Sequence, residues 1–252
     1  MGITDCRRLA PLLLLFVVLA GASACASAAR AQHVSAGCGR SRRIALTFDD
    51  GPNPPFTPQL LDELRAGRAR ATFFDEGEAA QADPADVRRE VADGMAIGSH
   101  SFSHSKSLPA MSATDFTSDL GRAEEALAPL LGFRPALYRP PYGHKSHTML
   151  GALRRAGYVS IGWDVDSGDW RADATPDEIA ANVLARAHPG AIVLLHDGGL
   201  GGGNPDRRAT VEALPRIIEA LRQQGYELVT VPELTGLPER QGATGAGACL
   251  AS

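Results

Sequence analysis

Short apolar segments alternate with amphipathic helical patterns along most of this chain, and no other feature constrains its fold as strongly. In residues 112–132, for example, apolar side chains recur at helical spacing between Ser112 and a terminal Gly132. An alternation of about seven β–α units favours an α/β fold, either a parallel barrel or a doubly wound sheet. The segments with strand-like composition are 43–48, 71–74, 95–98, 136–139, 158–163, 191–195 and 226–231.

Polar side chains follow the ends of five of these predicted strands. In parallel α/β folds the carboxyl ends of the strands meet at one edge of the sheet, where active sites are built. We therefore expect the five clusters to converge although they are far apart in the sequence. They begin at Asp49, His100, Arg139, Asp166 and His196.

The first two clusters predict a metal site. His100 and His104 are four positions apart, and on a helical turn this spacing places both imidazoles on one side. With Asp50 they supply three N/O ligands, the pattern of a catalytic zinc-type site with an open position. The alternative is a pair of histidines with separate hydrogen bonds, which the double acid Asp49-Asp50 disfavours. A metalloprotease would have Glu where this chain has Ser101, which disfavours that class.

The same clusters offer an acid and a base. Adjacent Asp49 and Asp50 suit divided roles, one bound to a cation and one free to act as a general base. An Asp-Gly turn would explain Asp50 but not the doubled acid. His196 follows a wholly apolar strand and suits a general acid, unless it only satisfies a local hydrogen bond. Arg139 and Asp169 can orient this pair, or they can form a purely structural ion pair.

Taken together, these residues resemble the NodB-homology polysaccharide deacetylases, carbohydrate esterase family 4. The resemblance spans residues 43–235 and implies a distorted, incomplete (β/α) barrel with a metal at its C-terminal rim. Five motifs of that family occur in order: TFDDGP at 47–52, HSFSH at 100–104, RPPYG at 139–143, DSGDW at 166–170 and LLHD at 194–197.

The resemblance also implies a role for each site residue. Asp49 is the general base, oriented by Arg139, and His196 is the general acid, oriented by Asp169. The backbone N–H of Tyr142 helps to bind the oxyanion. Trp170 and Leu195 wall a small pocket for the acetyl methyl group. The implied ligands of a divalent metal, most often zinc in this family, are Asp50, His100 and His104.

These roles imply a secreted deacetylase that hydrolyses N-acetyl groups of N-acetylglucosamine polymers, either chitin oligosaccharides or peptidoglycan. The nearest alternative keeps the site but cleaves O-acetyl esters of acetylxylan. A non-catalytic carbohydrate-binding relative is a third possibility. It is disfavoured because Asp49, His196 and the expected metal ligands are all present.

The N-terminus predicts export. A basic start, an apolar core at residues 9–19 and a small-x-small site at residues 29–31 are typical of a signal peptide over residues 1–31. The apolar core is too short for a stable membrane span, which disfavours a retained anchor. A lipoprotein attached through Cys25 is the other alternative. We expect an extracellular protein that acts as a monomer.

Charge and cysteine content agree with this interpretation. The net charge is −4, and removal of residues 1–31, with three arginines and one aspartate, leaves −6. Such a chain is unsuited to nucleic acid. Cys38 and Cys249 lie near the two ends of the mature chain and are candidates for a disulfide. We expect a linker at residues 32–42, the deacetylase domain at 43–235 and a Gly/Ala-rich tail at 236–252.

Overall fold

The computed structural model describes residues 33–199 and 205–250. The predicted signal peptide, its cleavage site and Cys25 lie outside the described residues. Among the helices that are described, none is both long and apolar enough to cross a membrane.

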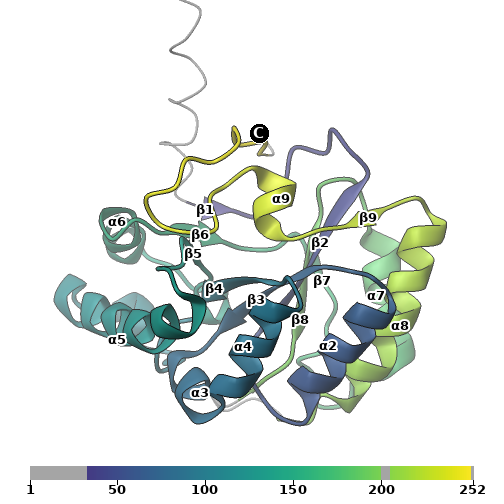
Figure 1. The fold of residues 1–252 in the computed structure, drawn as a ribbon, viewed down its shortest axis with the longest axis horizontal. Helices are drawn as coiled ribbons and strands as arrows, with labels where there is room; N and C mark the ends of the chain where they lie inside the picture. Colours follow the sequence, from purple (N-terminus) through teal and green to yellow (C-terminus); the bar gives the residue numbers. More distant parts are fainter. Residues whose placement is uncertain (1–32, 200–204, 251–252) are drawn as a thin grey trace, which may run out of the picture.

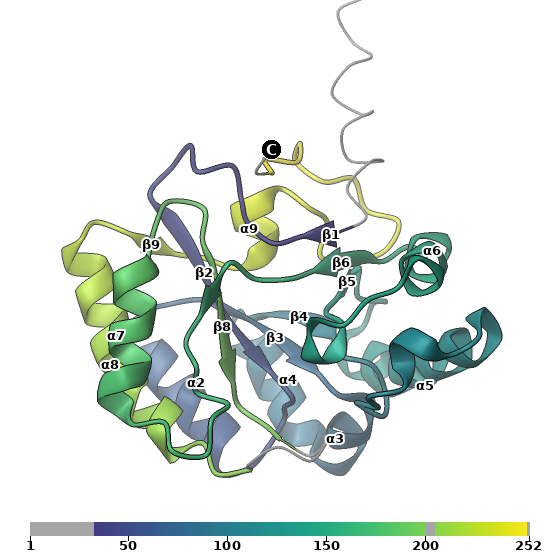
Figure 2. The ribbon, with the colours of Figure 1, turned by 180° about the vertical axis from the view of Figure 1, so that it is seen from behind.

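The described strands form one curled, parallel sheet (Figures 1 and 2). Its strand order is β1-β6-β5-β4-β3-β2-β8-β7, and β9 pairs with the start of β2. The curled sheet with helices around it confirms the predicted distorted, incomplete (β/α) barrel. The strands are β1 (His33–Val34), β2 (Arg43–Asp49), β3 (Ala71–Asp75), β4 (Ala96–Ser99), β5 (Leu137–Tyr138), β6 (Val159–Ile161), β7 (Val165–Asp166), β8 (Ile192–His196) and β9 (Glu227–Leu228).

Helices alternate with the strands, as the apolar spacing predicted. Two begin at the expected caps: the hydroxyl of Ser112 accepts from the backbone N–H of Asp115, and Thr175 forms a capping box with Glu178. The helices are α2 (Phe56–Ala66), α3 (Gly77–Ala82), α4 (Pro84–Ala92), α5 (Ala113–Leu131), α6 (His147–Arg155), α7 (Pro176–Arg186), α8 (Arg208–Gln223) and α9 (Val231–Thr235).

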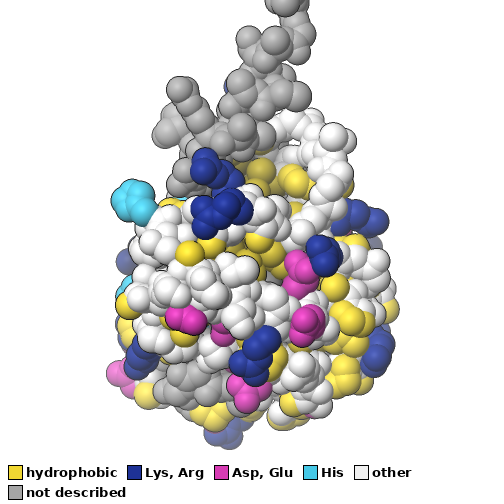
Figure 3. All heavy atoms as spheres, turned by 90° about the vertical axis from the view of Figure 1, so that its left-hand side faces the viewer, with side chains coloured by type: hydrophobic (Ala, Val, Ile, Leu, Met, Phe, Trp, Pro, Cys, Tyr) yellow, Lys and Arg dark blue, Asp and Glu magenta, His cyan; other side chains and the backbone are white. Residues whose placement is uncertain are grey.

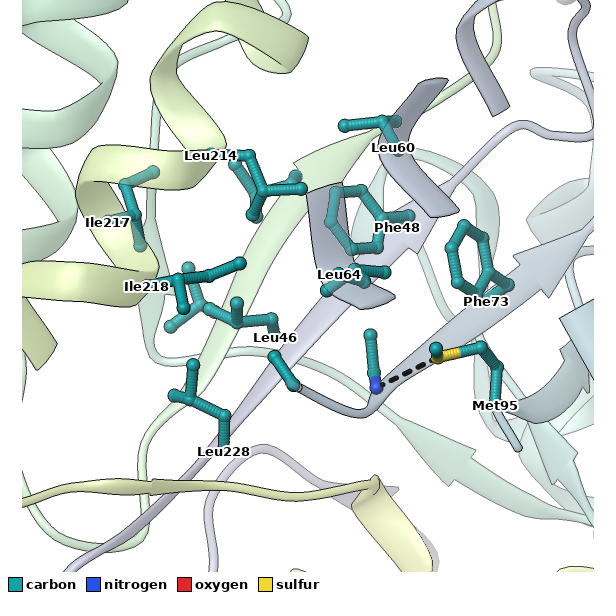
Figure 4. Close-up of a cluster of buried hydrophobic side chains, with 14 of the residues drawn as sticks. Leu46, Phe48, Leu60, Leu64, Phe73, Met95, Leu214, Ile217, Ile218 and Leu228 are labelled. Carbon is teal, nitrogen blue, oxygen red and sulfur yellow. Dashed lines mark hydrogen bonds between the residues drawn. The ribbon is translucent and has the colours of Figure 1, made fainter. Parts of the chain in front are cut away.

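The main core lies between the sheet and the helices that cover its outer side (Figure 4). Leu46 and Phe48 of β2 and Phe73 of β3 point toward these helices and are fully buried. Leu60 of α2 and Leu214 of α8 pack against them. Because side chains alternate along a strand, the intervening residues Thr47 and Asp49 face the inside of the barrel. The core therefore fixes which residues of β2 reach the rim.

Residues 32–42, expected to be a linker, contain a strand of the sheet. His33 and Val34 pair with Ser160 and Ile161 of β6. Ala36 then forms an isolated bridge with Ala191, just before β8. The segment thus spans the open side of the curled sheet. A two-residue strand carries too little apolar periodicity to be recognised in a sequence.

A disulfide joins Cys38 to Cys249, with their Cα atoms 5.0 Å apart, so the predicted bridge is confirmed. It links the segment between β1 and β2 to the C-terminal tail, near the N-terminal end of β2. The tail also pairs through isolated bridges, from Arg240 to Pro135 and from Leu250 to Gly37. This part of the tail is therefore attached to the barrel.

The face that carries α5 and α6 shows basic and acidic side chains interspersed among uncharged ones (Figure 3). No extended basic patch covers the described part of this face.

Candidate active site

The sheet register places the predicted acid and base side by side. Asp49, the last residue of β2, is the direct neighbour of His196, the last residue of β8. The predicted metal ligand His100 follows β4, and Arg139 follows β5, the strand that pairs with β4. The strand-end clusters therefore converge at one rim, as the sequence predicted.

Several side chains reach this rim from strained backbone. Asp50, Ser101, His104 and Tyr142 all have positive φ angles, between 47° and 75°. Non-glycine residues rarely adopt this region, and such strain is concentrated at functional sites. The helical turn that we expected at residues 100–104 is wrong. Those residues form an irregular loop, whose left-handed residues turn the two imidazoles toward each other.

Asp50, His100 and His104 form a buried cluster that can hold a metal ion, with one ligand atom from each residue within 4.8 Å of the others. Oδ1 of Asp50 lies 3.2 Å from Nε2 of His100 and 3.1 Å from Nε2 of His104. Burial raises the pKa of Asp50, but the two neighbouring histidines outweigh it and hold this pKa well below its usual value. Asp50 is thus an ionised ligand.

The donor set fits a divalent cation. Nδ1 of His100 lies 2.8 Å from the carbonyl oxygen of Arg139, so in the neutral ring the proton is on Nδ1 and the lone pair of Nε2 faces Asp50. Two acceptors that face each other in a buried site require a cation or a shared proton between them. Among the described residues, none donates a hydrogen bond to Oδ1 of Asp50. Two imidazoles and one carboxylate match a zinc-type site with an open position.

Asp49 is held by a fully buried arginine. Arg139 donates from one nitrogen to Oδ1 of Asp49 and to the hydroxyl of Thr47, both at 2.7 Å. Its other terminal nitrogen donates to the carbonyl of Gly162 at 3.0 Å. The guanidinium also stacks over the ring of Phe74, 4.1 Å from its centroid. Burial lowers the pKa of Arg139, and the neighbouring Asp49 offsets part of that shift. The hydrogen bonds of Arg139 keep Asp49 in one orientation.

His196 is held in the same way by Asp169. Oδ1 of Asp169 lies 2.8 Å from Nδ1 of His196, and its Oδ2 accepts from the backbone N–H of His196 and from Thr210. Burial lowers the pKa of His196, but Asp169, together with Asp50 and Asp49, raises it to about 9. At neutral pH the ring is therefore protonated and can donate from Nε2.

Arg207 is a site residue that the sequence analysis missed. Its buried guanidinium donates to the carbonyl oxygens of Gly198 and Asp169, at 2.7 and 3.2 Å. It therefore fixes the loop after β8 against the residue that holds His196. No motif pattern marks Arg207, because its role depends on a contact with Asp169, 38 residues earlier in the chain.

The converging residues line a cleft of about 390 Å³. Exposed aromatic side chains form part of its wall: Tyr142 is 39% and Trp170 is 53% exposed. Trp170 donates from its indole nitrogen to Asp166 at 3.2 Å. The full lining is Asp49, Asp50, His100, His104, Lys106, Tyr142, Trp163, Asp166, Trp170, Leu194, His196 and Arg207.

The prediction that Leu195 lines the pocket for the acetyl methyl group is wrong by one position in the sequence. Leu195 is fully buried in the core between sheet and helices, whereas Leu194 lines the cleft. Side chains of β8 alternate between the two faces, so Leu194 shares the inner face with His196. The expectation for Leu195 is therefore wrong, and Leu194 is the leucine that lines the cleft, as Trp170 also does.

Comparisons with known proteins agree with this site. The family profile described as polysaccharide deacetylase matches residues 36–161. A peptidoglycan-N-acetylglucosamine deacetylase of Bacillus cereus is 39% identical over 195 residues, covering 76% of this chain and 87% of that protein. A chitooligosaccharide deacetylase of Bradyrhizobium is 38% identical, covering 77% and 91%. A crystal structure of a peptidoglycan N-acetylglucosamine deacetylase superimposes with a TM-score of 0.79 at 32% identity, covering 86% of this chain and 98% of that one.

Proposed function

The chain belongs to the polysaccharide deacetylase family, carbohydrate esterase family 4, and we propose that it removes N-acetyl groups from glycans that contain N-acetylglucosamine. The products are acetate and a free amine on the sugar. Chitin oligosaccharides and peptidoglycan are the two substrate classes, because the similar proteins are named for these glycans.

One observation carries the proposal. A base and an acid, Asp49 and His196, are neighbours across β2 and β8, and both lie beside the Asp50–His100–His104 cluster. Amide hydrolysis needs such a pair, since water must lose a proton while the leaving nitrogen gains one. A protein that only binds carbohydrate needs neither the paired groups nor the buried metal-ligand cluster.

Asp50, His100 and His104 would hold the divalent metal, and zinc suits this donor set. A metal there would polarise the acetyl carbonyl and make water more acidic. The remaining chemistry comes from the chain itself. The carboxylate of Asp49 accepts a proton from the attacking water, and Arg139 keeps that carboxylate aimed into the cleft.

The tetrahedral carbon formed by water attack then loses its C–N bond. His196 donates its proton from Nε2 to the departing nitrogen, while Asp169 stabilises the charged ring through Nδ1. The backbone N–H of Tyr142 is the proposed donor to the developing oxyanion. The apolar side chain of Leu194 and the ring of Trp170 would enclose an acetyl methyl group and disfavour longer acyl chains.

Acetate release from three substrates tests the proposal: chitooligosaccharides, peptidoglycan fragments and acetylxylan. We expect acetate from an N-acetylated glycan, loss of activity after rigorous chelation, and recovery with added zinc. Release from acetylxylan alone would favour the O-acetyl esterase instead. Glycan binding without acetate release would support a non-catalytic relative.

We further propose that the protein is exported by a signal peptide over residues 1–31 and acts outside the cell. The confirmed disulfide supports this location, because such bonds persist in oxidising compartments. N-terminal sequencing of the mature protein tests the proposal, with Gln32 expected as the first residue. A lipid-modified N-terminus at Cys25 would contradict it and establish the lipoprotein alternative.

A further inference from the structure

One cationic side chain in the cleft has no place in the mechanism. Lys106 follows the metal-ligand cluster in the loop after β4 and lines the cleft beside Tyr142. Its amine lies over the Tyr142 ring, 5.6 Å from the centroid, and that ring in turn lies 4.6 Å from the ring of His104. Lys106 and Lys145 are the only lysines in the 252-residue chain.

The charge of Lys106 is available to a ligand. Among the described residues, no carboxylate forms an ion pair with Lys106, which is exposed. The other basic residue of the cleft lining, Arg207, is buried and donates to two backbone carbonyls. A flexible stem carries the Lys106 amine, so it can leave the Tyr142 ring for a stronger partner.

The acidic side chains that line the cleft have partners other than the Lys106 amine. Asp49 is paired with Arg139, and Asp50 faces the two histidines. Asp166 accepts from the Trp170 indole and from the backbone N–H of Gly168. The Tyr142 side of the cleft therefore presents a positive charge toward whatever occupies it. An uncharged chitin chain offers that charge no counter-ion, whereas a glycan with a carboxylate does.

We propose that Lys106 is a specificity-determining residue that binds a carboxylate on the sugar adjoining the N-acetylglucosamine whose amide is cleaved. The lactyl ether of N-acetylmuramic acid in peptidoglycan carries such a group. This inference rests on the proposed function and narrows its substrate class to anionic glycans. The carboxylate replaces the Tyr142 ring as the partner of the amine, and a charged oxygen is the better acceptor.

Three matched glycans test the inference. They are an oligosaccharide of alternating N-acetylglucosamine and N-acetylmuramic acid, the same compound with its lactyl groups methyl-esterified, and a chitooligosaccharide of equal length. The kcat/KM for acetate release is measured for the wild type and for Lys106→Gln. Lys145→Gln, at an exposed position outside the cleft lining, is the control.

We expect Lys106→Gln to lower kcat/KM about two- to fivefold on the free acid, the size of an exposed ion pair, and to leave the ester and the chitooligosaccharide unchanged. High salt should remove the difference, and Lys145→Gln should behave as wild type. Equal changes on all three glycans, or none, would overturn the inference while leaving the proposed function in place. A wild type that releases acetate from none of them would overturn the proposed function itself.

Discussion

Two parts of the catalytic rim differ in how firmly the fold holds their side chains. The pairs Asp49–Arg139 and Asp169–His196 lie on strand ends or against them, and each pair is hydrogen-bonded, with Asp49, Arg139 and Asp169 buried. Tyr142 and Trp170, by contrast, stand on loops and are 39% and 53% exposed. The difference indicates that the reaction is fixed by the sheet while the choice of glycan is left to the loops.

The largest effect on activity should follow from replacing the general base, Asp49, in the buried part of the rim. Asp49→Asn keeps the volume and the hydrogen bond from Arg139 but cannot accept a proton. We expect kcat/KM for acetate release to fall about 10³- to 10⁴-fold. Thermal unfolding of the variant should stay close to that of the wild type. Near-normal turnover would remove Asp49 from the mechanism.

The Asp169–His196 pair predicts how kcat/KM depends on pH. The pKa of His196 is raised to about 9, so its acid form exists below that pH and is lost as the pH rises through it. The wild type should lose kcat/KM above about pH 9. Asp169→Asn removes the carboxylate that raises this pKa, so the alkaline limb should move to lower pH, with activity reduced about 100-fold or more. An unmoved limb would show that Asp169 does not act through His196.

Replacing Gly198 tests whether activity depends on the exact position of the backbone at the buried part of the rim. A Cβ on Gly198 would lie 1.7 Å from the backbone oxygen of Asp50, so Gly198→Ala must displace the metal-ligand loop. We expect a loss of about 10- to 100-fold in kcat/KM. Gly121→Ala in α5, where nothing lies within 4 Å of the new Cβ, is the matched control and should keep full activity. Equal activity of the two variants would contradict the claim that the rim must hold its backbone in one position.

Replacing an exposed aromatic side chain of the cleft should have the smallest effect on kcat/KM. Trp170→Ala removes an aromatic surface but no group that moves a proton. We expect KM for a chitooligosaccharide to rise about two- to tenfold with kcat within twofold of wild type, since one aromatic contact contributes about 1 kcal/mol. A fall in kcat as large as that of Asp169→Asn would abolish the distinction between the two parts of the rim.

The sequence predicted the site residues at strand ends better than those in loops for a physical reason. Asp49, His100 and His196 follow apolar strands, and parallel strands bring their carboxyl ends together whatever their distance along the chain. A pattern of apolar residues therefore locates them. Lys106 and Arg207 lie in loops, where no periodicity says which way a side chain points.

Two errors, one from a spacing argument and one from the family resemblance, show what the sequence left open. The His100–His104 spacing suggested a helical turn, but left-handed backbone at Ser101 and His104 produces the same convergence in a loop. Leu195 was assigned to the cleft although strand alternation gives that place to Leu194. For the histidines the missing information was the local backbone conformation, which residue type alone does not determine. For Leu195 it was the alternation of side chains along the strand that ends at His196.

The central claim is that adjacent carboxylates divide the work, Asp49 as base and Asp50 as metal ligand. Measuring zinc content and acetate release together, for Asp49→Asn and Asp50→Asn loaded with zinc, tests it most directly. The account predicts that Asp49→Asn retains about one zinc per chain, as the three ligands remain, yet releases almost no acetate. Asp50→Asn should lose both zinc and activity. Loss of zinc from Asp49→Asn, or full zinc binding by Asp50→Asn, would contradict it.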